Sequence, residues 1–380
     1  MSDLLAVGSY TSATGGRGSG IALVARDPGS GRLGADAVAL PAASPSYLAL
    51  AGGGVPAAPA AAEVLLHAAH ELPDGVLSTW RVRRGDASRG IAPGGEQLAR
   101  VPTGGAHPCH VAVHPSGRLL VVSDYGGTTG VVAAEGGVAQ RLVQVVEPRG
   151  SGPRPDRQEG PHPHSAAFLD DGHVVVADLG TDELRVHAVV LDAGGAPARL
   201  DPDPVQVVAA PPGSGPRTAL VRRHPGGDLL HLSGELSSTL LTAPTSGGRL
   251  GGLRSVPAQA AAPPPAGPPE GSAGSAPQPS EVAALDDALL VAVRGLDVLA
   301  VHRGGRVVDV PLAGGSATGD RPQARNPRHV AVVGRHAYVS AQDSDLVLHL
   351  ELALDDAGGG PRVVAWSSSR TGSPTVVLPL

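Results

Sequence analysis

The tetrapeptide Pro108-Cys109-His110-Val111 is one copy of a short phrase that recurs seven times along the chain. Each copy begins with proline, which suits the first position of a β-strand because no ladder donor is needed there. Successive prolines lie 63, 55, 53, 63, 48 and 47 residues apart. Among repeat architectures, a self-similar unit of this length indicates propeller blades. The copies begin at Pro45, Pro108, Pro163, Pro216, Pro279, Pro327 and Pro374.

A short run rich in Val, Leu and Ala follows each of the first six copies, between Gly, Asp or Ser residues that are typical of strand ends. The seventh copy has no such run, but Leu4–Tyr10 at the N-terminus is a run of this kind. We therefore predict an all-β, seven-bladed β-propeller whose N-terminal strand completes the C-terminal blade and so removes free sheet edges. The six runs are Val64–Glu71, Leu119–Tyr125, Val174–Leu179, Leu229–Glu235, Leu289–Arg294 and Ala337–Gln342.

The composition limits the classes of partner and the cellular location. A net charge of -6 and a pI near 6.2 argue against the basic face that a nucleic-acid partner needs. The sequence contains no run of 18 apolar residues, so we predict no membrane span. The N-terminus lacks the basic segment that begins a signal peptide, so we expect no signal peptide. The single cysteine excludes an internal disulfide and is compatible with the cytoplasm. We therefore expect a cytoplasmic protein with one propeller domain over residues 1–380 and with neither a nucleic acid nor a membrane as partner.

Two stretches are typical of loops rather than strands, residues 51–62 and residues 257–279. The second is rich in Pro, Ala, Gly and Ser, a composition that does not support a packed core. We predict that residues 257–279 form a mobile loop insertion.

Replacing the middle of residues 257–279 by a short Gly/Ser bridge is expected to change the free energy of unfolding by less than about 1 kcal/mol, because loop-closure entropy grows slowly with length. Urea unfolding of the two proteins measures the change. A collapse in stability would instead show that the segment packs on the ring or on a partner.

In a propeller the inner strands converge on a central channel, so the residue after each phrase proline should lie near one mouth of it. The ends of the second strands should approach the same mouth. Neighbouring blades then supply a histidine, a carboxylate and two arginines there, a set that suits proton transfer or acyl chemistry on an anionic substrate. The expected ring after the prolines is Ser46, Cys109, His164, Arg217, Ser280, Arg328 and Thr375. The expected strand-end ring is Tyr10, Glu71, Tyr125, Leu179, Glu235, Arg294 and Gln342.

The sequence resembles the seven-bladed propeller lactonases, a family that includes a type of 6-phosphogluconolactonase, over essentially its whole length. The combination of Arg157-Gln158 and Pro161-His162-Pro163-His164-Ser165 with Ala177–Asp182 is the most specific part of the resemblance. Other matching segments are Pro108–Val111, Asp124–Gly127, Gly213–Arg217, Glu235–Thr239 and Pro279–Glu281.

The resemblance implies hydrolysis of a sugar lactone, with 6-phosphogluconolactone as the lead substrate and no redox cofactor. In that reaction His164 or Glu235 would activate water, and Arg217 and Arg294 would hold the phosphate or the oxyanion. The family also contains fungal cycloisomerases acting on carboxymuconate, in which a His, two Arg and a Glu are the proposed site. By motif this set falls on His164, Arg217, Glu235 and Arg294.

Further residues are expected to bind the substrate around this set. His162 and His164 share a face if they lie in a strand and could bind a metal, but no carboxylate or cysteine at ligand spacing completes a zinc set, so no metal site is predicted. Cys109 is expected to be an inert buried thiol, and Asp178 and Asp182 to cap turns. The predicted substrate-binding residues are His162, Arg157, Gln158, Glu71, Tyr125, Arg328 and Gln342.

Three positions depart from the family pattern. Thr218, Gly234 and Val293 stand where the family usually or often has His, Asn and Asn. These departures keep two alternatives open beside lactone hydrolysis. One is a cycloisomerase acting on a muconate-like diacid, and the other is a non-catalytic propeller that binds a metabolite or a protein.

Overall fold

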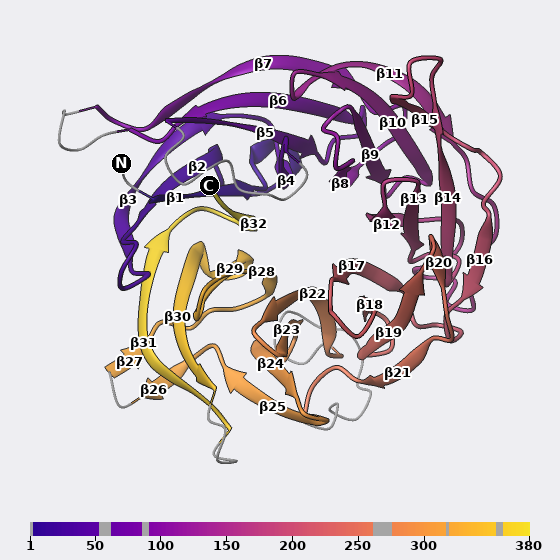
Figure 1. Ribbon diagram of the computed structural model, residues 1–380. Coiled ribbons are helices and arrows are strands. Elements are labelled where there is room, and N and C mark those ends of the chain that lie inside the picture. The colour runs from indigo at the N-terminus through magenta and orange to yellow at the C-terminus, as the bar shows by residue number, and fades with distance from the viewer. Residues whose placement is uncertain (1–2, 53–61, 86–90, 261–275, 317–318, 355–359) are drawn as a thin grey trace.

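The computed structural model describes residues 3–52, 62–85, 91–260, 276–316, 319–354 and 360–380. Its strands form seven antiparallel sheets of four or five strands around a common centre, and a separate small hairpin (Figure 1). Within these ranges the helical elements are short 3-10 turns, and no helix is long and apolar enough to cross a membrane. The prediction of an all-β, seven-bladed propeller is confirmed.

Blades 1 to 3 follow one another along the chain, each running outward from the centre. Blade 1 contains β4 (Pro45–Leu50), β5 (Glu63–His70), β6 (Val76–Arg83) and β7 (Gly94–Pro102). Blade 2 contains β8 (Pro108–Val113), β9 (Leu119–Asp124), β10 (Thr128–Glu135) and β11 (Val138–Val146). Blade 3 contains β12 (Pro163–Asp170), β13 (His173–Asp178), β14 (Glu183–Leu191) and an outer strand in two pieces, β15 (Pro197–Leu200) and β16 (Gln206–Ala209).

Blades 4 to 6 have the same order. Blade 4 contains β17 (Pro216–Arg222), β18 (Asp228–Gly234), β19 (Thr239–Ser246), β20 (Arg249–Leu250) and β21 (Arg254–Pro257). Blade 5 contains β22 (Gln278–Leu285), β23 (Ala288–Arg294), β24 (Val298–Arg303) and β25 (Arg306–Pro311). The hairpin β26 (Gly314–Ser316) and β27 (Gly319–Arg321) precedes blade 6, which contains β28 (Pro327–Val333), β29 (His336–Ala341), β30 (Leu346–Leu354) and β31 (Pro361–Arg370).

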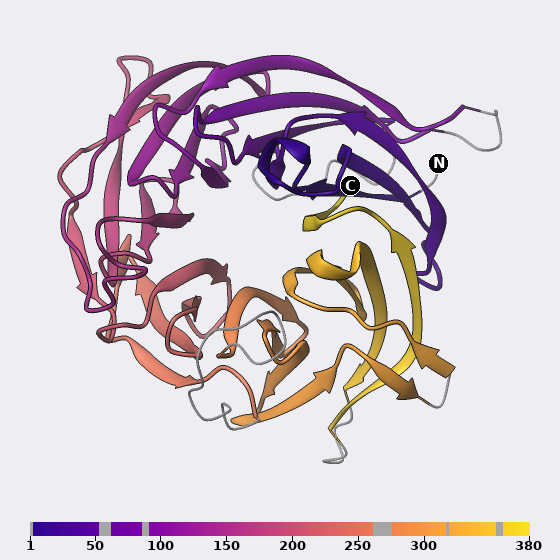
Figure 2. The same cartoon turned by 180° about the vertical axis from the view of Figure 1, so that it is seen from behind.

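Blade 7 is assembled from both ends of the chain. Its inner strand is β32 (Pro374–Pro379), and the next three strands are β1 (Asp3–Ser9), β2 (Gly20–Arg26) and β3 (Leu33–Pro41). Strand β1 pairs antiparallel with β32 on one side and with β2 on the other. The predicted closure by the N-terminal strand is therefore present, and it extends to three strands. Seen from the opposite side, the ring closes at the same place (Figure 2).

A bulge follows the phrase proline in every blade. Six of the seven phrase prolines are the first residue of an inner strand, and Pro279 is the second. Directly after the proline the pairing with the neighbouring strand shifts register, as between Pro45 and Tyr47 in blade 1. Because a bulge sets two residues against one, the two residues after the proline can both approach the channel.

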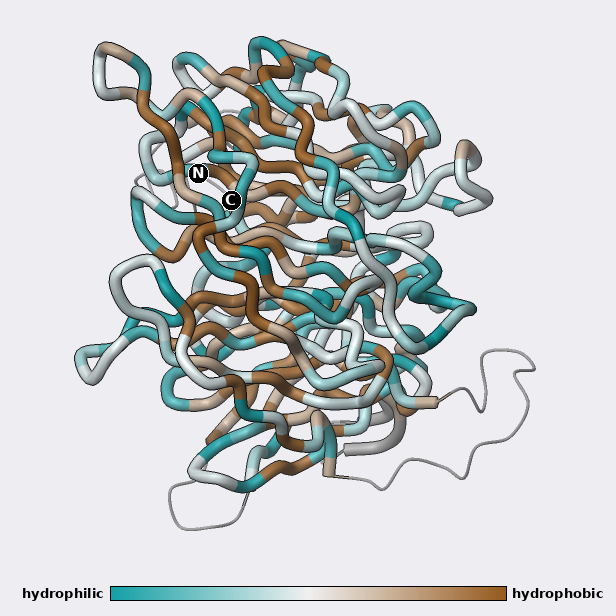
Figure 3. The backbone as a smooth tube through the Cα atoms, turned by 90° about the vertical axis from the view of Figure 1, so that its right-hand side faces the viewer, coloured by the Kyte–Doolittle hydropathy of each residue, from teal (hydrophilic) through white to brown (hydrophobic). Residues whose placement is uncertain are grey.

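Aliphatic side chains fill the space between neighbouring sheets. The largest cluster joins blades 5 and 6 through residues such as Leu290, Leu299, Val339 and Leu348, all of them fully buried. Figure 3 shows the hydrophobic positions concentrated along the strands and the hydrophilic ones in the connecting loops. With an aromatic content of only 2%, the packing depends on Val, Leu and Ala, each contributing through the apolar area that it removes from water.

Both predicted insertions fall largely outside the described residues, since residues 53–61 and 261–275 are not among them. The described ends of the second insertion are packed, contrary to the expectation of little packing. Ala258 is fully buried and donates its N–H to the carbonyl of Ser238 at 2.9 Å, and Gln259 is buried beside it. The prediction of a mobile loop thus stays a prediction for residues 261–275.

Candidate active site

The mouth of the channel is the end at which the inner strands begin and the second strands end. The residues predicted at the second-strand ends lie one position beyond the strand in most blades, where the chain turns. Arg294 is the exception, as the last residue of β23. These turns carry the polar side chains of the mouth, which gather into two clusters.

The first group, the Glu235 cluster, consists of Glu235, Arg157, Arg217 and Arg294. The Oε1 atom of Glu235 lies 2.7 Å from Nη2 of Arg157. Its Oε2 atom lies 2.7 Å from Nε of Arg217 and 2.6 Å from Nη2 of Arg294. One carboxylate that is 3% exposed therefore holds three guanidinium groups from three separate parts of the ring.

The electrostatics of this cluster follow from its charge, one negative against three positive. Burial opposes ionisation of Glu235, but Arg294, Arg217 and Arg157 outweigh it and lower its pKa well below the ordinary range. Burial is also the main influence on Arg294, whose pKa falls to about 10 despite the contribution of Glu235. The cluster keeps a net charge of about +2 in a desolvated place, and an added anion would offset that charge.

Arg294 has donors to spare. Its Nε and Nη2 atoms are buried, and neither has a hydrogen-bond acceptor of good geometry within the described ranges. The short distance from Nη2 to Glu235 is thus an ion pair whose N–H bond does not point at the carboxylate. The Nε atom of Arg217 likewise lies close to Glu235 and has no hydrogen-bond acceptor of good geometry among the described residues. Two buried guanidinium groups therefore keep N–H donors that have no acceptor among the described residues.

Arg157 reaches the cluster from the segment between β11 and β12, and Gln158 anchors that segment. The Gln158 side chain is fully buried, its Nε2 donates to the carbonyl of Leu179 at 2.8 Å, and its Oε1 accepts from the backbone of Arg154 at 3.2 Å. Both polar atoms of the Gln158 amide are thus bound to backbone, and its contact with substrate stays a prediction. Its role is to fix the approach of Arg157.

Arg217 is fixed by the turn in front of it and by the neighbouring blade. Asp182 accepts backbone hydrogen bonds from Gly213 at 2.6 Å and Gly215 at 2.8 Å, which holds the loop leading into β17. The Nη1 atom of Arg217 donates to the carbonyl of Ser280 in blade 5. Asp178 caps its own turn through the backbone N–H groups of Gly180 and Thr181. Both aspartates thus have the turn-capping role expected from the sequence.

The second group, the Glu71 cluster, consists of Glu71, Tyr10 and Arg328 from blades 1, 7 and 6. The hydroxyl of Tyr10 donates to Oε2 of Glu71 at 2.7 Å and accepts from Nη2 of Arg328 at 2.5 Å. The Arg328 guanidinium lies over the Tyr10 ring, 4.9 Å from its centroid, and 3.8 Å from Oε2 of Glu71. Here one carboxylate faces one guanidinium, so this cluster is close to neutral.

Below the mouth, a cavity of about 20 Å³ forms the floor of the site, large enough for one water molecule. Of the seven residues predicted after the prolines, six line it. The exception is Ser280, whose hydroxyl donates to the carbonyl of Pro327 at 2.7 Å and lies 3.1 Å from that of Ala292. Five of the lining residues were not predicted, and each directly follows a residue of the predicted ring because of the bulge: Tyr47, His110, Thr218, Glu281 and His329.

His164 and Cys109 lie side by side on this floor, with 3.8 Å between Nδ1 and Sγ. Burial, helped by the charge of Arg217, lowers the pKa of His164 well below its ordinary value, so its imidazole is neutral at pH 7. Burial likewise raises the pKa of the Cys109 thiol, which agrees with the expectation of an inert thiol.

The unpredicted residues form a buried acid–base group beneath His164. The Nε2 atom of His329 lies 3.6 Å from Oε2 of Glu281, and the ring of Tyr47 lies 4.2 Å from that of His110. Burial raises the pKa of Glu281 to about 8 and lowers those of His110 and His329 to about 3. The sequence does contain a signal for these residues, because each is a polar residue two positions after a phrase proline.

His162, Tyr125 and Gln342 complete the predicted set. Both ring nitrogens of His162 are engaged, Nδ1 with the carbonyl of Tyr125 at 2.6 Å and Nε2 with Glu159 at 3.1 Å. Its ring stacks on Tyr125 with 4.4 Å between centroids, so His162 holds Tyr125 in place. The Tyr125 hydroxyl lies 3.4 Å from Nη2 of Arg157. Gln342 follows β29 and has a buried Oε1 without a partner in the described part of the chain.

The departures from the family pattern have local structural reasons. Thr218 donates its hydroxyl to the carbonyl of Ser280 at 2.7 Å and accepts from Nη1 of Arg217 at 3.0 Å, so it helps to hold that guanidinium. A Cβ on Gly234 would lie 2.3 Å from Oγ1 of Thr239, so an asparagine would require the Thr239 side chain to move. Val293 is fully buried in the apolar contact between blades.

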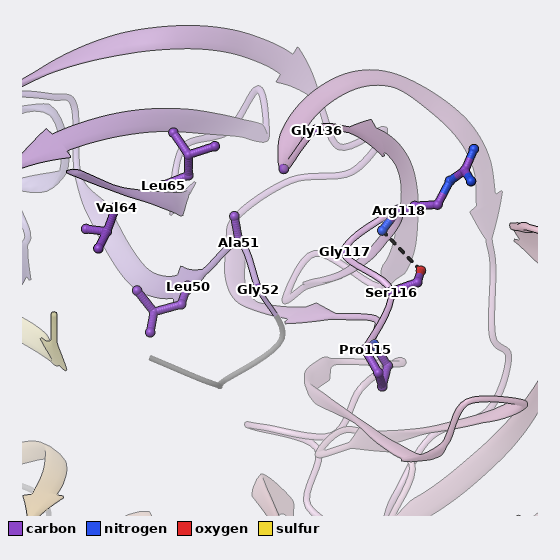
Figure 4. Close-up of a pocket in the computed structure, with 11 residues that line it drawn as sticks. Leu50, Ala51, Gly52, Val64, Leu65, Pro115, Ser116, Gly117, Arg118 and Gly136 are labelled. Atoms are coloured by element: carbon purple, nitrogen blue, oxygen red, sulfur yellow. Dashed lines mark hydrogen bonds between the residues drawn. The ribbon is translucent and has the colours of Figure 1, made fainter. Parts of the chain in front are cut away.

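Larger hollows elsewhere are lined mainly by apolar residues and glycine. A pocket of about 450 Å³ lies between blades 1 and 2, with Leu50, Val64 and Leu65 on one side and Pro115 and Arg118 on the other (Figure 4). Arg118 is the one ionisable residue among those that line it, and nothing there pairs an acid with a base. A cavity of about 700 Å³ at the opposite end of the channel is lined mainly by apolar residues of the inner strands. The mouth is the better candidate for catalysis.

Comparison with known proteins agrees with this fold. The chain is 32% identical over 142 residues to a probable 6-phosphogluconolactonase of Arthroderma benhamiae, covering 36% of this chain and 34% of that one. It is 31% identical over 152 residues to the 6-phosphogluconolactonase of Bacillus subtilis, covering 38% and 40%. The matched regions thus span about two fifths or less of the curated relatives.

A solved structure and a family model cover nearly the whole chain. The periplasmic gluconolactonase of Pseudomonas aeruginosa has the same fold, with a TM-score of 0.76 and 24% identity over 100% of this chain and 99% of that one. The model of the family "Lactonase, 7-bladed beta-propeller" matches residues 4–372. The chain therefore belongs to the seven-bladed β-propeller lactonase family.

Proposed function

We propose that this protein hydrolyses a sugar lactone that carries an anionic group, with 6-phosphogluconolactone as the lead substrate. The observation that carries the proposal is the Glu235 cluster, in which a buried carboxylate gathers three guanidinium groups and leaves about two positive charges uncompensated. Planar guanidinium groups suit phosphate and carboxylate through paired N–H donors. The names of the fungal and bacterial relatives support the same substrate class.

In the proposed reaction water attacks the lactone carbonyl, the negative charge develops on the carbonyl oxygen, and the ring C–O bond then breaks. Arg217 and Arg294 have buried donors available and would hold the phosphate or stabilise the oxyanion. Glu235 is a poor base because three guanidinium groups hold it ionised. We therefore propose that its role is to orient these arginines. His164 is neutral and lies on the floor of the site, where it can exchange hydrogen bonds with substrate or water.

The reaction needs water and side chains only, so we propose no cofactor. We further propose a cytoplasmic location, as expected from the sequence, and a small anionic metabolite as the partner.

The test is an assay of the purified protein with 6-phosphogluconolactone and with uncharged gluconolactone, each compared with its spontaneous hydrolysis. We expect acceleration that favours the phosphorylated lactone, and competitive inhibition by inorganic phosphate. Loss of a muconate chromophore without lactonase activity would identify a cycloisomerase instead. If the folded protein is inactive on the lactones and on the muconate, a non-catalytic binding role is favoured.

A further inference from the structure

We propose that Glu71 is the general base that removes a proton from the attacking water, and that Tyr10 and Arg328 position it. This inference rests on the proposed lactone hydrolysis. It names a residue for the step that Glu235 is unable to perform.

The two carboxylates at the mouth have opposite surroundings. Glu235 is 3% exposed and has three guanidinium groups within 2.7 Å of its oxygens. Glu71 is 20% exposed, and its nearest guanidinium, that of Arg328, lies 3.8 Å away. A carboxylate shared by three cations binds a proton weakly. Glu71 is the more exposed of the two and lacks this constraint, so its place suits the removal of a proton from water.

The hydrogen bonds of Glu71 leave one oxygen available. Tyr10 donates to Oε2 at 2.7 Å, and within the described ranges no donor is bound to Oε1. The Tyr10 hydroxyl is itself held by Arg328, whose guanidinium packs on the Tyr10 ring. Burial raises the pKa of Tyr10, so its hydroxyl stays protonated and keeps donating. The carboxylate is thus held by Oε2, with Oε1 free to accept from a water molecule.

The position of the Glu71 cluster relative to the Glu235 cluster suits a site in which Glu71 removes a proton and the arginines of the Glu235 cluster bind the anion. Glu71, Tyr10 and Arg328 come from blades 1, 7 and 6, whereas Arg217, Glu235 and Arg294 come from blades 4 and 5. Arg328 of the Glu71 cluster and Arg217 of the Glu235 cluster both line the small cavity below the mouth, so the two clusters border one site. A lactone whose anionic group is bound by the arginines of blades 4 and 5 would present its ring toward Glu71.

The steps balance without another reactant. Glu71 takes one proton from water as the water oxygen forms its bond to the carbonyl carbon. The tetrahedral intermediate then collapses, the bond to the ring oxygen breaks, and Glu71 returns the proton to that oxygen. The products are the hydroxy acid and a regenerated carboxylate.

The experiment compares Glu71→Gln, Glu71→Ala and Tyr10→Phe with the wild-type enzyme on 6-phosphogluconolactone. General-base catalysis typically contributes 10²–10⁴-fold, so Glu71→Gln is expected to lower kcat by about 10²-fold or more with little change in KM. Added formate should restore part of the activity of Glu71→Ala but not of Glu71→Gln, because only the alanine leaves space for a small carboxylate. Tyr10→Phe should lower kcat several-fold, leaving KM and the melting temperature nearly unchanged.

The matched control is Glu351→Gln. Glu351 lies on β30, away from the mouth, and its largely buried carboxylate pairs with Arg335. This variant should keep the wild-type kcat. Full activity of Glu71→Gln, or loss of activity in Glu71→Ala that formate fails to restore, would overturn the role of Glu71. Absence of lactonase activity in the wild-type enzyme would instead overturn the proposed function, and with it this step.

Discussion

Deleting residues 1–10 is expected to lower the free energy of unfolding by several kcal/mol, enough to prevent stable folding of a ring of ordinary stability. Strand β1 lies between β32 and β2, so its loss breaks two hydrogen-bonded ladders and separates the inner strand of blade 7 from the rest of the blade. It also removes Leu4, Leu5, Ala6 and Val7, all essentially fully buried. Each Leu or Val side chain contributes about 1.5–3 kcal/mol by burial.

Urea unfolding of the truncated and full-length proteins measures this effect. A suitable control is Val207→Ser, because Val207 lies on the outer strand β16 and is largely exposed, so its loss should change stability by less than about 0.5 kcal/mol. An unchanged unfolding midpoint in the truncated protein would mean that β32 is held by its neighbours in blades 1 and 6 alone.

The sequence predicted the inner half of each blade and little of the outer half. The proline phrases located the start of each first strand, and the buried apolar runs located the second strands, to within one residue, because both follow requirements that repeat in every blade. The third strands are largely buried but share no such phrase, and the outer strands are more exposed and vary in length. The split outer strands of blades 3 and 4 and the hairpin β26–β27 were therefore not foreseen.

The candidate site was predictable where a side chain lies at a repeated position. Glu235, Arg217 and Arg294 occupy such positions, and the structure brings them into contact. Contacts made by irregular segments were not predictable, as the anchoring of the Arg157 segment by the Gln158 amide demonstrates. The bulge after each proline was also missed, although a polar residue two positions after six of the seven phrase prolines is its signal in the sequence. It adds Tyr47, Glu281 and other residues to the floor.

Replacing Arg217 by alanine is expected to lower kcat/KM by about 10²-fold or more, the usual consequence of losing a donor to a developing oxyanion. The same change should weaken inhibition by inorganic phosphate. The stability cost should stay near 1 kcal/mol, because Glu235 would keep Arg157 and Arg294 and so would not become an unpaired buried charge. His164→Ala is expected to lower activity with a similarly small loss of melting temperature.

The pattern across four variants separates catalysis from structure. Glu235→Gln removes the only carboxylate among three guanidinium groups, so it should lose both activity and several kcal/mol of stability. Arg185→Ala breaks a buried ion pair with Asp178 that is outside both mouth clusters, so it should lose stability but keep phosphate inhibition. Full lactonase activity in both Arg217→Ala and His164→Ala would contradict the site. Loss of stability in Arg217→Ala as large as in Glu235→Gln would contradict the excess positive charge, because removing one of three cations would then behave like removing their shared anion.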